Sequence, residues 1–492
     1  MKYCTPEKAG ISSADVLKFY KCLDAFNLST HSVILARGDE IFSECYYEPF
    51  NKDFFHRMYS VSKTFVAIAI GFCEQDGLIS LDDPMIKYFG EYIQDKPKEN
   101  IPTSTIRDLL KMKTSIENPI NWFRIVCPDR TAVYFDKAAE KHPNTLFNYD
   151  SPASYMLGVI VEKVTGKPML KYLQEKVLDD IGFSKDAYMI QAPGGHSFGD
   201  SGVMCTARDL LLFARFVLNK GTFNGKRYLN AEYIESATNM DLSTSDFGFT
   251  DPEAYGYGYQ IWGAPDGAFA MNGMGTQVAL CDPKRDLVFV INSDNQGNHL
   301  GYDHVYVALY SNIMNNLSSG ESLPENPEAK AELDEYIKSR KLFHLTGNKE
   351  TSFSRKISGK VFECDENPMG IKWFKLDLDS EKGTLTYENA QGEKSFPFGM
   401  GYNEFAKFPQ EGYSDLVATV YAEGNYYDSA FSADWPEEKS LRIRVQVIDK
   451  YFGNLAIYFA FKDEDTVSVR MRKKAEGFLR EYEGLMNAKS RK

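Results

Sequence analysis

The stretch Met58-Tyr59-Ser60-Val61-Ser62-Lys63-Thr64-Phe65 combines a Ser-x-x-Lys pattern with the start of an apolar helix. The run Val66 to Phe72 is apolar on all sides, as in a buried helix, and Asp76-Gly77 is a typical helix end. Because positions i and i+3 share a helix face, we expect Ser60 and Lys63 to lie within hydrogen-bonding reach. Burial and the positive end of the helix dipole both favour a neutral lysine amine. Such an amine can activate a serine hydroxyl as a nucleophile, whereas the alternative is a helix N-cap serine with an exposed lysine.

The segments around this helix predict an α/β (α+β) sandwich, with an antiparallel sheet flanked by helices. An early helix is expected over Ser12–Phe26, followed by two strands at 31–36 and 41–47 that form a hairpin. Later strands are expected at 255–262, 268–283 and 287–292, where they can join the early hairpin in one sheet. Further helices are expected at 104–112, 155–166 and 210–218, with an irregular segment at 118–143.

The composition changes after Met314, which divides the chain into three parts. Residues 1–317 are predicted to form the first domain, and 318–350 a linker with a charged amphipathic helix at 329–343. Residues 351–492 are predicted to form a small all-β domain that is barrel-like. Its expected strands are 360–362, 371–376, 384–387, 417–421, 441–447, 455–461 and 467–471. A lid on a pocket, a specificity module and a homodimer surface remain alternatives for its role.

Charge and composition exclude several classes of partner. The net charge is -13 and the pI is near 5.2, which disfavours nucleic acids and anionic membranes because phosphates would be repelled. A small molecule or short peptide suits this balance better. The sequence has no signal-peptide pattern and no long apolar run, so we expect a cytoplasmic protein without a membrane segment. The eight cysteines occur singly, which favours free thiols over disulfides or zinc, and we expect no metal and no cofactor.

Three short motifs occur in a fixed order along the chain: Ser60-Val61-Ser62-Lys63, Tyr149-Asp150-Ser151 and Met271-Asn272-Gly273. Residues 201–209 and 255–259 add two further matches. With these motifs, residues 5 to 310 resemble the serine β-lactamase-related family, which includes class C β-lactamases, D-Ala-D-Ala carboxypeptidases and related esterases and amidohydrolases. The resemblance implies a fold of the β-lactamase/transpeptidase type.

The resemblance also implies a role for individual residues. Ser60 would attack a carbonyl group and form an acyl-enzyme, while Lys63 and Tyr149 would share the work of the base. A tyrosine has an ordinary pKa of about 10, so it needs a cationic neighbour such as Lys63 to become a phenolate. The backbone amides of Ser60 and of Met274, just after Gly273, would hold the negative oxygen of the tetrahedral intermediate.

Two positions depart from the family pattern. Ser151 stands where an asparagine is usual, and Met271 stands where a lysine or histidine is usual. A methionine cannot bind a substrate carboxylate as a lysine does, so β-lactams and peptides with a free carboxyl end are disfavoured. His56 and His196 lie near motifs but are expected to be structural. Aromatic residues that are candidates to line a pocket are Trp122, Tyr59, Tyr255 and Tyr257.

Together these features predict a serine hydrolase, without a metal, that cleaves small esters, amides or short peptides through an acyl-enzyme. One alternative is a β-lactamase or D-Ala-D-Ala carboxypeptidase with the same mechanism. Another is a catalytically silent binding protein that keeps the fold, although a binder has no need of Ser60, Lys63 and Tyr149 together.

Overall fold

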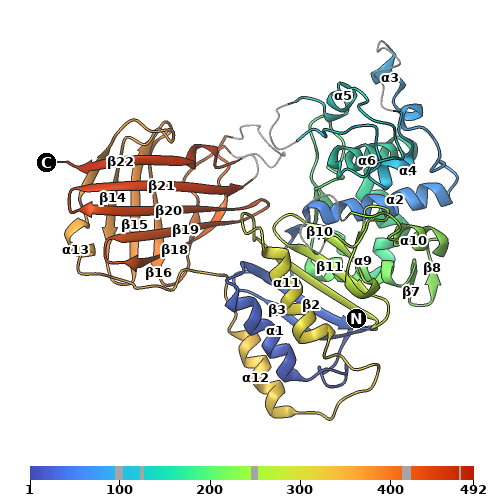
Figure 1. Cartoon of the computed structure of the whole chain (residues 1–492), viewed down its shortest axis with the longest axis horizontal. Coiled ribbons are helices and arrows are strands. Elements are labelled where there is room, and N and C mark those ends of the chain that lie inside the picture. The colour runs from blue at the N-terminus through green and yellow to red at the C-terminus, as the bar shows by residue number, and fades with distance from the viewer. Residues whose placement is uncertain (95–102, 122–126, 245–252, 413–422, 476–477, 492) are drawn as a thin grey trace. The chain divides into compact units, whose positions relative to one another are not determined.

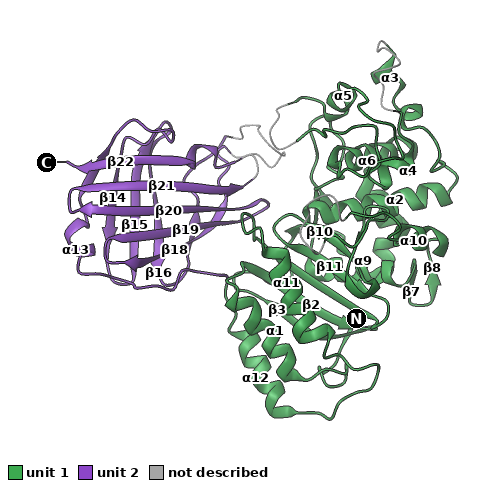
Figure 2. Cartoon of the chain, viewed as in Figure 1, with its two compact units in different colours: residues 1–122, 127–341 green, residues 123–126, 342–492 purple. Residues whose placement is uncertain are grey.

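The computed structural model describes residues 1–94, 103–121, 127–244, 253–412, 423–475 and 478–491 (Figure 1). Trp122 and the strand expected at 417–421 therefore lie outside the described residues. The described chain divides into two compact units, one formed by residues up to 341 and the other by residues from 342 on (Figure 2). Each unit has its own large sheet.

The first unit is built on a mixed sheet in which seven strands are described, in the order β1-β3-β2-β12-β11-β10-β9. The early hairpin joins the later strands through β12, where Leu35 lies opposite Phe289, so the predicted single sheet is confirmed. β1 runs parallel to β3, and the other neighbours are antiparallel. The strands are β1 (Lys2–Tyr3), β2 (Thr30–Arg37), β3 (Glu40–Tyr46), β9 (Trp262–Gly263), β10 (Phe269–Gly273), β11 (Gln277–Asp282) and β12 (Leu287–Ser293).

Helices cover both faces of this sheet, as predicted for the sandwich. On one face, α1 (Ser13–Ala25) and α11 (Gly301–Leu309) share a core with the sheet, and Phe19 meets Phe289 edge to face at 5.9 Å. Leu280 of β11 belongs to that core. The next residue, Cys281, points the other way and lies 3.6 Å from the Ala214 carbonyl oxygen of α9 (Ala207–Leu218).

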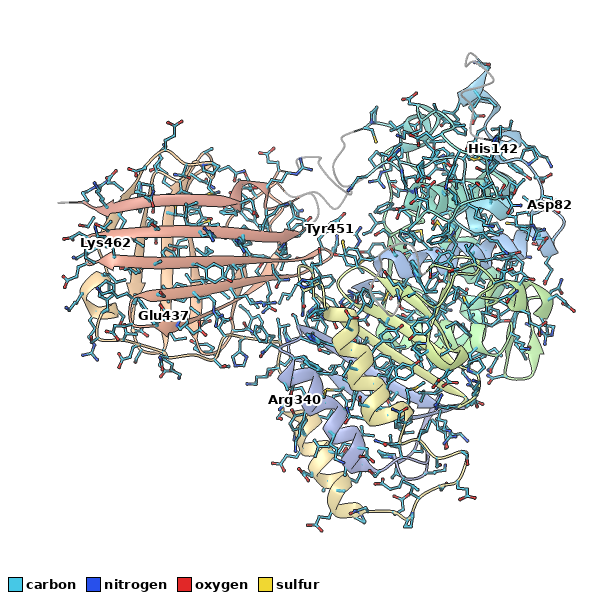
Figure 3. All side chains as sticks on the ribbon, viewed as in Figure 1. Asp82, His142, Arg340, Glu437, Tyr451 and Lys462 are labelled. Atoms are coloured by element: carbon cyan, nitrogen blue, oxygen red, sulfur yellow. The ribbon has the colours of Figure 1, made fainter. Side chains whose placement is uncertain are left out.

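α12 (Pro327–Lys338) belongs to the first unit, where it packs on α1. Its Leu333 is buried in the α1 core. Arg340, labelled in Figure 3, follows the helix, forms an ion pair with Asp24 of α1 and lies 3.7 Å from the Tyr336 ring centroid. The helix ends five residues before the predicted position 343, because the chain after it turns extended: Glu48 N donates to the Arg340 carbonyl at 3.1 Å, and Lys341 forms a parallel β-bridge with Glu48.

The helix predicted from the Ser-x-x-Lys stretch is confirmed as α2 (Ser62–Gln75), in which all residues from Ser62 to Cys73 are buried. It packs against α6 (Ser151–Thr165). α6 begins four residues earlier than predicted, because the Asp150 side chain accepts a hydrogen bond from Ala153 N at 3.1 Å and caps the helix. Shorter elements near these helices include β4 (His56–Arg57), β5 (Tyr188–Met189), β6 (Val203–Cys205), α3 (Gly90–Ile93), α4 (Ile106–Leu110), α7 (Met169–Leu173), α8 (Asp179–Ile181) and α10 (Ala231–Ala237).

Three local predictions are wrong. The strand expected at 268–283 is two antiparallel strands, β10 and β11, joined by a turn at 274–276. The strand expected at 255–262 is irregular up to β9, since Gly256 (φ +97°) and Gln260 (φ +58°) take left-handed backbone conformations that turn the chain. The segment 118–143, expected to be irregular, contains α5 (Arg130–Phe135), which Asp129 caps by accepting from the amides of Thr131 and Ala132.

The second unit is the predicted barrel-like β domain, and this prediction is confirmed. Ten strands are described, and a pairing between β16 and β18 closes nine of them into a ring, with β17 outside it. Buried residues alternate with partly or fully exposed ones along most of β15 and β21, as a barrel requires. The strands are β13 (Val361–Cys364), β14 (Trp373–Leu378), β15 (Lys382–Asn389), β16 (Gly392–Met400), β17 (Glu404–Lys407), β18 (Asp428–Glu437), β19 (Ser440–Ile448), β20 (Phe452–Asp463), β21 (Thr466–Ala475) and β22 (Gly484–Ser490).

The left-handed cap of α6 is expected to matter for stability. Gly166 ends this helix at φ +67°, with its amide donating to the Glu162 carbonyl. A Gly166→Ala substitution should lower the free energy of unfolding by about 1 kcal/mol, because a Cβ disfavours this conformation. Gly90→Ala is the matched control, since Gly90 lies in α3 with no atom within 4 Å of an added Cβ and should lose no stability. Thermal unfolding of both variants measures the difference, and equal losses would contradict this account.

Candidate active site

Ser60 lies in a tight turn between a strand and a helix. The turn is the 3₁₀ segment η1 (Tyr59–Val61), which joins β4 to α2. Met58 N donates to the Val203 carbonyl of β6 at 2.9 Å, which ties the turn to the neighbouring strand. Tyr59, directly before the serine, has φ +47°, an uncommon conformation for a residue with a side chain. These constraints fix the position of Ser60, which remains partly exposed.

The Lys63 amine is held in hydrogen-bonding contact with Ser60. Its Nζ lies 2.9 Å from Ser60 Oγ and donates to the Asp200 backbone carbonyl at 2.7 Å. The residue is only 2% exposed. Burial lowers the pKa of Lys63 to about 8, against the opposing charges of Asp200 and Asp150. A substantial fraction of the amine is therefore neutral near physiological pH and can accept a proton.

Tyr149 completes a cluster of three polar side chains. It precedes the Asp150 cap of α6, and its ring centroid lies 5.1 Å from Lys63 Nζ. The ring stacks on Trp262 at 5.4 Å. Burial raises the pKa of Tyr149 well above its ordinary value, and a hydrogen bond to the Ser60 side chain opposes this only in part. Burial therefore favours the neutral phenol of Tyr149 over the phenolate that a charged Lys63 could stabilise.

The turn after β10 approaches the Ser60 turn closely. A Cβ on Gly273 would lie 2.5 Å from the Met58 carbonyl oxygen, so only glycine allows this contact. Tyr302 Oη of α11 donates to the Gly273 carbonyl at 2.5 Å. The Gly273 carbonyl and the Met274 N–H belong to one planar peptide unit, so holding the carbonyl on one side directs the N–H to the other.

A buried glutamine supports the same turn from within the sheet. Gln277 is fully buried, and its Nε2 donates to the Met274 carbonyl at 3.0 Å and to the Ser293 carbonyl at 2.6 Å. Its Oε1 accepts from Ser293 N at 3.1 Å and from Asn292 Nδ2 at 3.2 Å. The amide thus uses both donors and both lone pairs.

The other residues singled out from the sequence differ in how far they are buried. Ser151 is the first residue of α6 and is partly exposed, whereas Met271 is 1% exposed within β10. Tyr257 is buried and meets the Tyr149 ring edge to face at 6.4 Å. Tyr255 is 48% exposed. Trp122 lies outside the described residues.

Both histidines near the motifs have partners away from this cluster. His56 is buried, and its Nε2 lies 2.9 Å from His31 Nδ1, while its Nδ1 lies 2.9 Å from the Arg57 carbonyl oxygen. His196 Nδ1 lies 2.7 Å from a Glu162 carboxylate oxygen. The His31–His56 contact joins β2 to β4, and the His196–Glu162 contact joins the segment before β6 to α6.

The sequence did not single out Asp200, Trp262, Gln277 or Tyr302. Asp200 directly precedes the matching segment 201–209, and its contact with Lys63 is made by the backbone carbonyl, which any residue type has. The part of the chain that the structure describes contains no group of three or more His, Cys, Asp or Glu side chains placed to hold a metal ion. Within the same residues, no helix is both long and apolar enough to cross a membrane.

A family model and a known relative both match a large part of the chain. The family model described as Beta-lactamase matches residues 27–311. The 6-aminohexanoate-dimer hydrolase of Paenarthrobacter ureafaciens is 27% identical over 295 residues, which cover 55% of this chain and 72% of that protein.

One solved structure supports the fold of the first unit. A putative 6-aminohexanoate-dimer hydrolase from Bacillus anthracis superposes with a TM-score of 0.51 at 23% identity, over 62% of this chain and 83% of its own. A penicillin-binding protein homologue from Pyrococcus abyssi, described as octameric, gives a TM-score of 0.47 at 15% identity, over 95% of this chain and 98% of its own. Because the family model spans more than half of the sequence, the chain belongs to the Beta-lactamase family.

Proposed function

We propose that the protein is a serine hydrolase that cleaves small esters, amides or short peptides through an acyl-enzyme. The observation that carries the proposal is the contact of 2.9 Å between Lys63 Nζ and Ser60 Oγ, made by a buried amine whose pKa is lowered to about 8. In this proposal Lys63 takes the Ser60 proton as Oγ attacks the carbonyl carbon of the substrate.

Tyr149 carries the proton onward in the same proposal. The neutral phenol gives its proton to the leaving group and regains one from Lys63, after which water cleaves the acyl-enzyme by the reverse transfers. The amides of Ser60 and Met274 receive the negative charge that develops on the substrate oxygen. The Tyr302 contact supports this role, since a hydrogen bond to the Gly273 carbonyl polarises the shared peptide and strengthens its N–H as a donor.

Several observations bear on the substrate. The relative from Paenarthrobacter ureafaciens is named for hydrolysis of the 6-aminohexanoate dimer, and amino acids joined amine to carboxyl form an amide. This supports amides among the bonds cleaved. Met271 is apolar and 1% exposed, so it offers no cation for a substrate carboxylate. A β-lactamase or carboxypeptidase activity is therefore less well supported.

The nucleophile is tested by covalent labelling. A fluorophosphonate probe should label the wild type, and Ser60→Ala should lose both the label and the hydrolysis of p-nitrophenyl acetate. Ser62→Ala is the matched control, because the Ser62 hydroxyl accepts from Val203 N at 2.9 Å and its loss should cost about 1 kcal/mol of stability but leave labelling intact. Labelling that survives in Ser60→Ala would contradict the assignment.

The base is tested by the pH dependence of the reaction. Only the neutral Lys63 amine accepts a proton, so kcat/KM for p-nitrophenyl acetate should rise with pH through a midpoint near 8. The midpoint reports the free enzyme, because kcat/KM refers to free enzyme and free substrate. A rate that falls as the pH rises through this range would rule out Lys63 as the base.

The oxyanion support is tested with Tyr302→Phe, which removes only the hydroxyl group. We expect kcat to fall by about 3- to 10-fold with little change in KM, less than the 100- to 1,000-fold loss typical of removing an oxyanion donor itself. Tyr310→Phe is the matched control, since Tyr310 Oη also donates to a carbonyl, that of Pro265 at 3.1 Å, and should leave kcat unchanged. Equal effects of the two substitutions would show that the Tyr302 hydroxyl has no special role.

A further inference from the structure

A buried carboxylate that the proposed mechanism does not use lies beside Lys63. Asp200 accepts a hydrogen bond from Lys63 Nζ through its backbone carbonyl at 2.7 Å. The residue itself is 1% exposed. Its side-chain Oδ1 has no hydrogen-bond partner among the described residues. Burying a carboxylate costs free energy unless nearby positive charges or hydrogen bonds replace its lost hydration.

Two buried arginines supply positive charge near the Asp200 carboxyl group. Arg57 of β4 and Arg130 of α5 are 0% and 1% exposed. Arg57 donates from Nε to the Ser201 carbonyl at 3.1 Å and from Nη2 to Ser201 Oγ at 3.2 Å. The Arg130 guanidinium lies 4.3 Å from the Phe198 ring centroid. Both arginines thus border the segment 198–201 that carries Asp200.

The charged groups of this cluster differ in how easily they gain or lose a proton. Burial raises the pKa of the Asp200 carboxyl, while Lys63, Arg130 and Arg57 oppose the rise. Arginine stays protonated in proteins, so the two guanidinium groups favour the ionised form of Asp200 beside them. Lys63 is the cation of the cluster that can lose its proton.

We propose that Asp200 is a positioning residue for Lys63: its backbone carbonyl orients the amine, and its carboxylate charge sets the pH at which the amine accepts the Ser60 proton. This inference rests on the proposed function, in which Lys63 is the base. The titratable and charged groups that interact with Lys63 or Asp200 from the surrounding elements are Arg57, Arg130, Tyr149, Asp150 and Tyr155. Arg130 also interacts with Cys127.

The direction of the effect follows from the opposing contributions at Lys63. Burial lowers the pKa of Lys63, and the Asp200 charge is the larger of two opposing contributions, the other being Asp150. If the Asp200 charge is removed, burial is opposed less and the pKa of Lys63 falls further. The amine then becomes neutral at lower pH, but it is also a weaker base.

The test is the pH profile of Asp200→Asn with p-nitrophenyl acetate. Asparagine keeps the backbone carbonyl and nearly the same shape, so the Lys63 contact with Ser60 should persist. We expect the midpoint of the kcat/KM rise to move to lower pH by about one unit. The plateau value of kcat should fall by a few-fold with KM unchanged.

The control is Asp282→Asn. Asp282 is also fully buried and pairs with Arg285 at 2.6 Å, but it lies at the end of β11 remote from the Gly273 turn. Its substitution should lower stability and leave the midpoint in place. If Asp200→Asn does not fold, Asp200→Ser carries the same expectation.

The outcomes separate this inference from the proposed function. A wild type that neither reacts with a fluorophosphonate nor hydrolyses the ester would overturn the proposed function and this inference with it. A wild type that turns over, with Ser60→Ala inactive, upholds the proposed function. In that case the pH profile of kcat/KM decides the role of Asp200 alone. That role is overturned if the Asp200→Asn or Asp200→Ser variant keeps the wild-type midpoint or moves it to higher pH.

Discussion

The centre of the first unit depends on holding the Lys63 amine in a nearly dry site. A buried amine needs acceptors, and the described ones are Ser60 Oγ and the Asp200 carbonyl. The apolar α2 provides the dry environment, since all its residues from Ser62 to Cys73 are buried. Because water is excluded, the neutral amine is favoured and the contact with the serine becomes chemically useful. The chemistry of the Ser60–Lys63 pair therefore depends on the apolar helix that buries Lys63.

A second constraint acts on the turn that faces Ser60. Side chains from two different elements hold it, Tyr302 from α11 and Gln277 from β11. Gln277 makes four hydrogen bonds with its amide group, and such a fully satisfied buried network has one favoured geometry. The Gly273–Met274 peptide is thus fixed by the sheet and a helix, which gives a donor there a set direction before any substrate arrives.

Local patterns predicted the parts of this arrangement that lie close together in the chain. The apolar run after Ser60 predicted a helix, and the strand patterns predicted one sheet in the first part of the chain and a separate β domain in the last. The structure confirms the helix and both sheets. The strand expected at 255–262 failed because Gln260 takes a left-handed conformation that its residue type does not reveal. α5 was missed because its cap, Asp129, opens a helix of only six residues. The contacts of Tyr302 with the Gly273 carbonyl and of the Asp200 carbonyl with Lys63 could not be predicted, because each joins residues distant in sequence and depends on a backbone group that every residue type has.

The two titratable partners of Ser60 show how one physical effect can produce opposite roles. In water, lysine and tyrosine both keep their protons at neutral pH, with pKa values near 10. Burial favours the neutral form of each, so it lowers the pKa of Lys63 and raises that of Tyr149. The neutral lysine is a proton acceptor, and the neutral tyrosine is a proton donor. A single dry site therefore supplies both the proton acceptor and the proton donor that an acyl transfer requires.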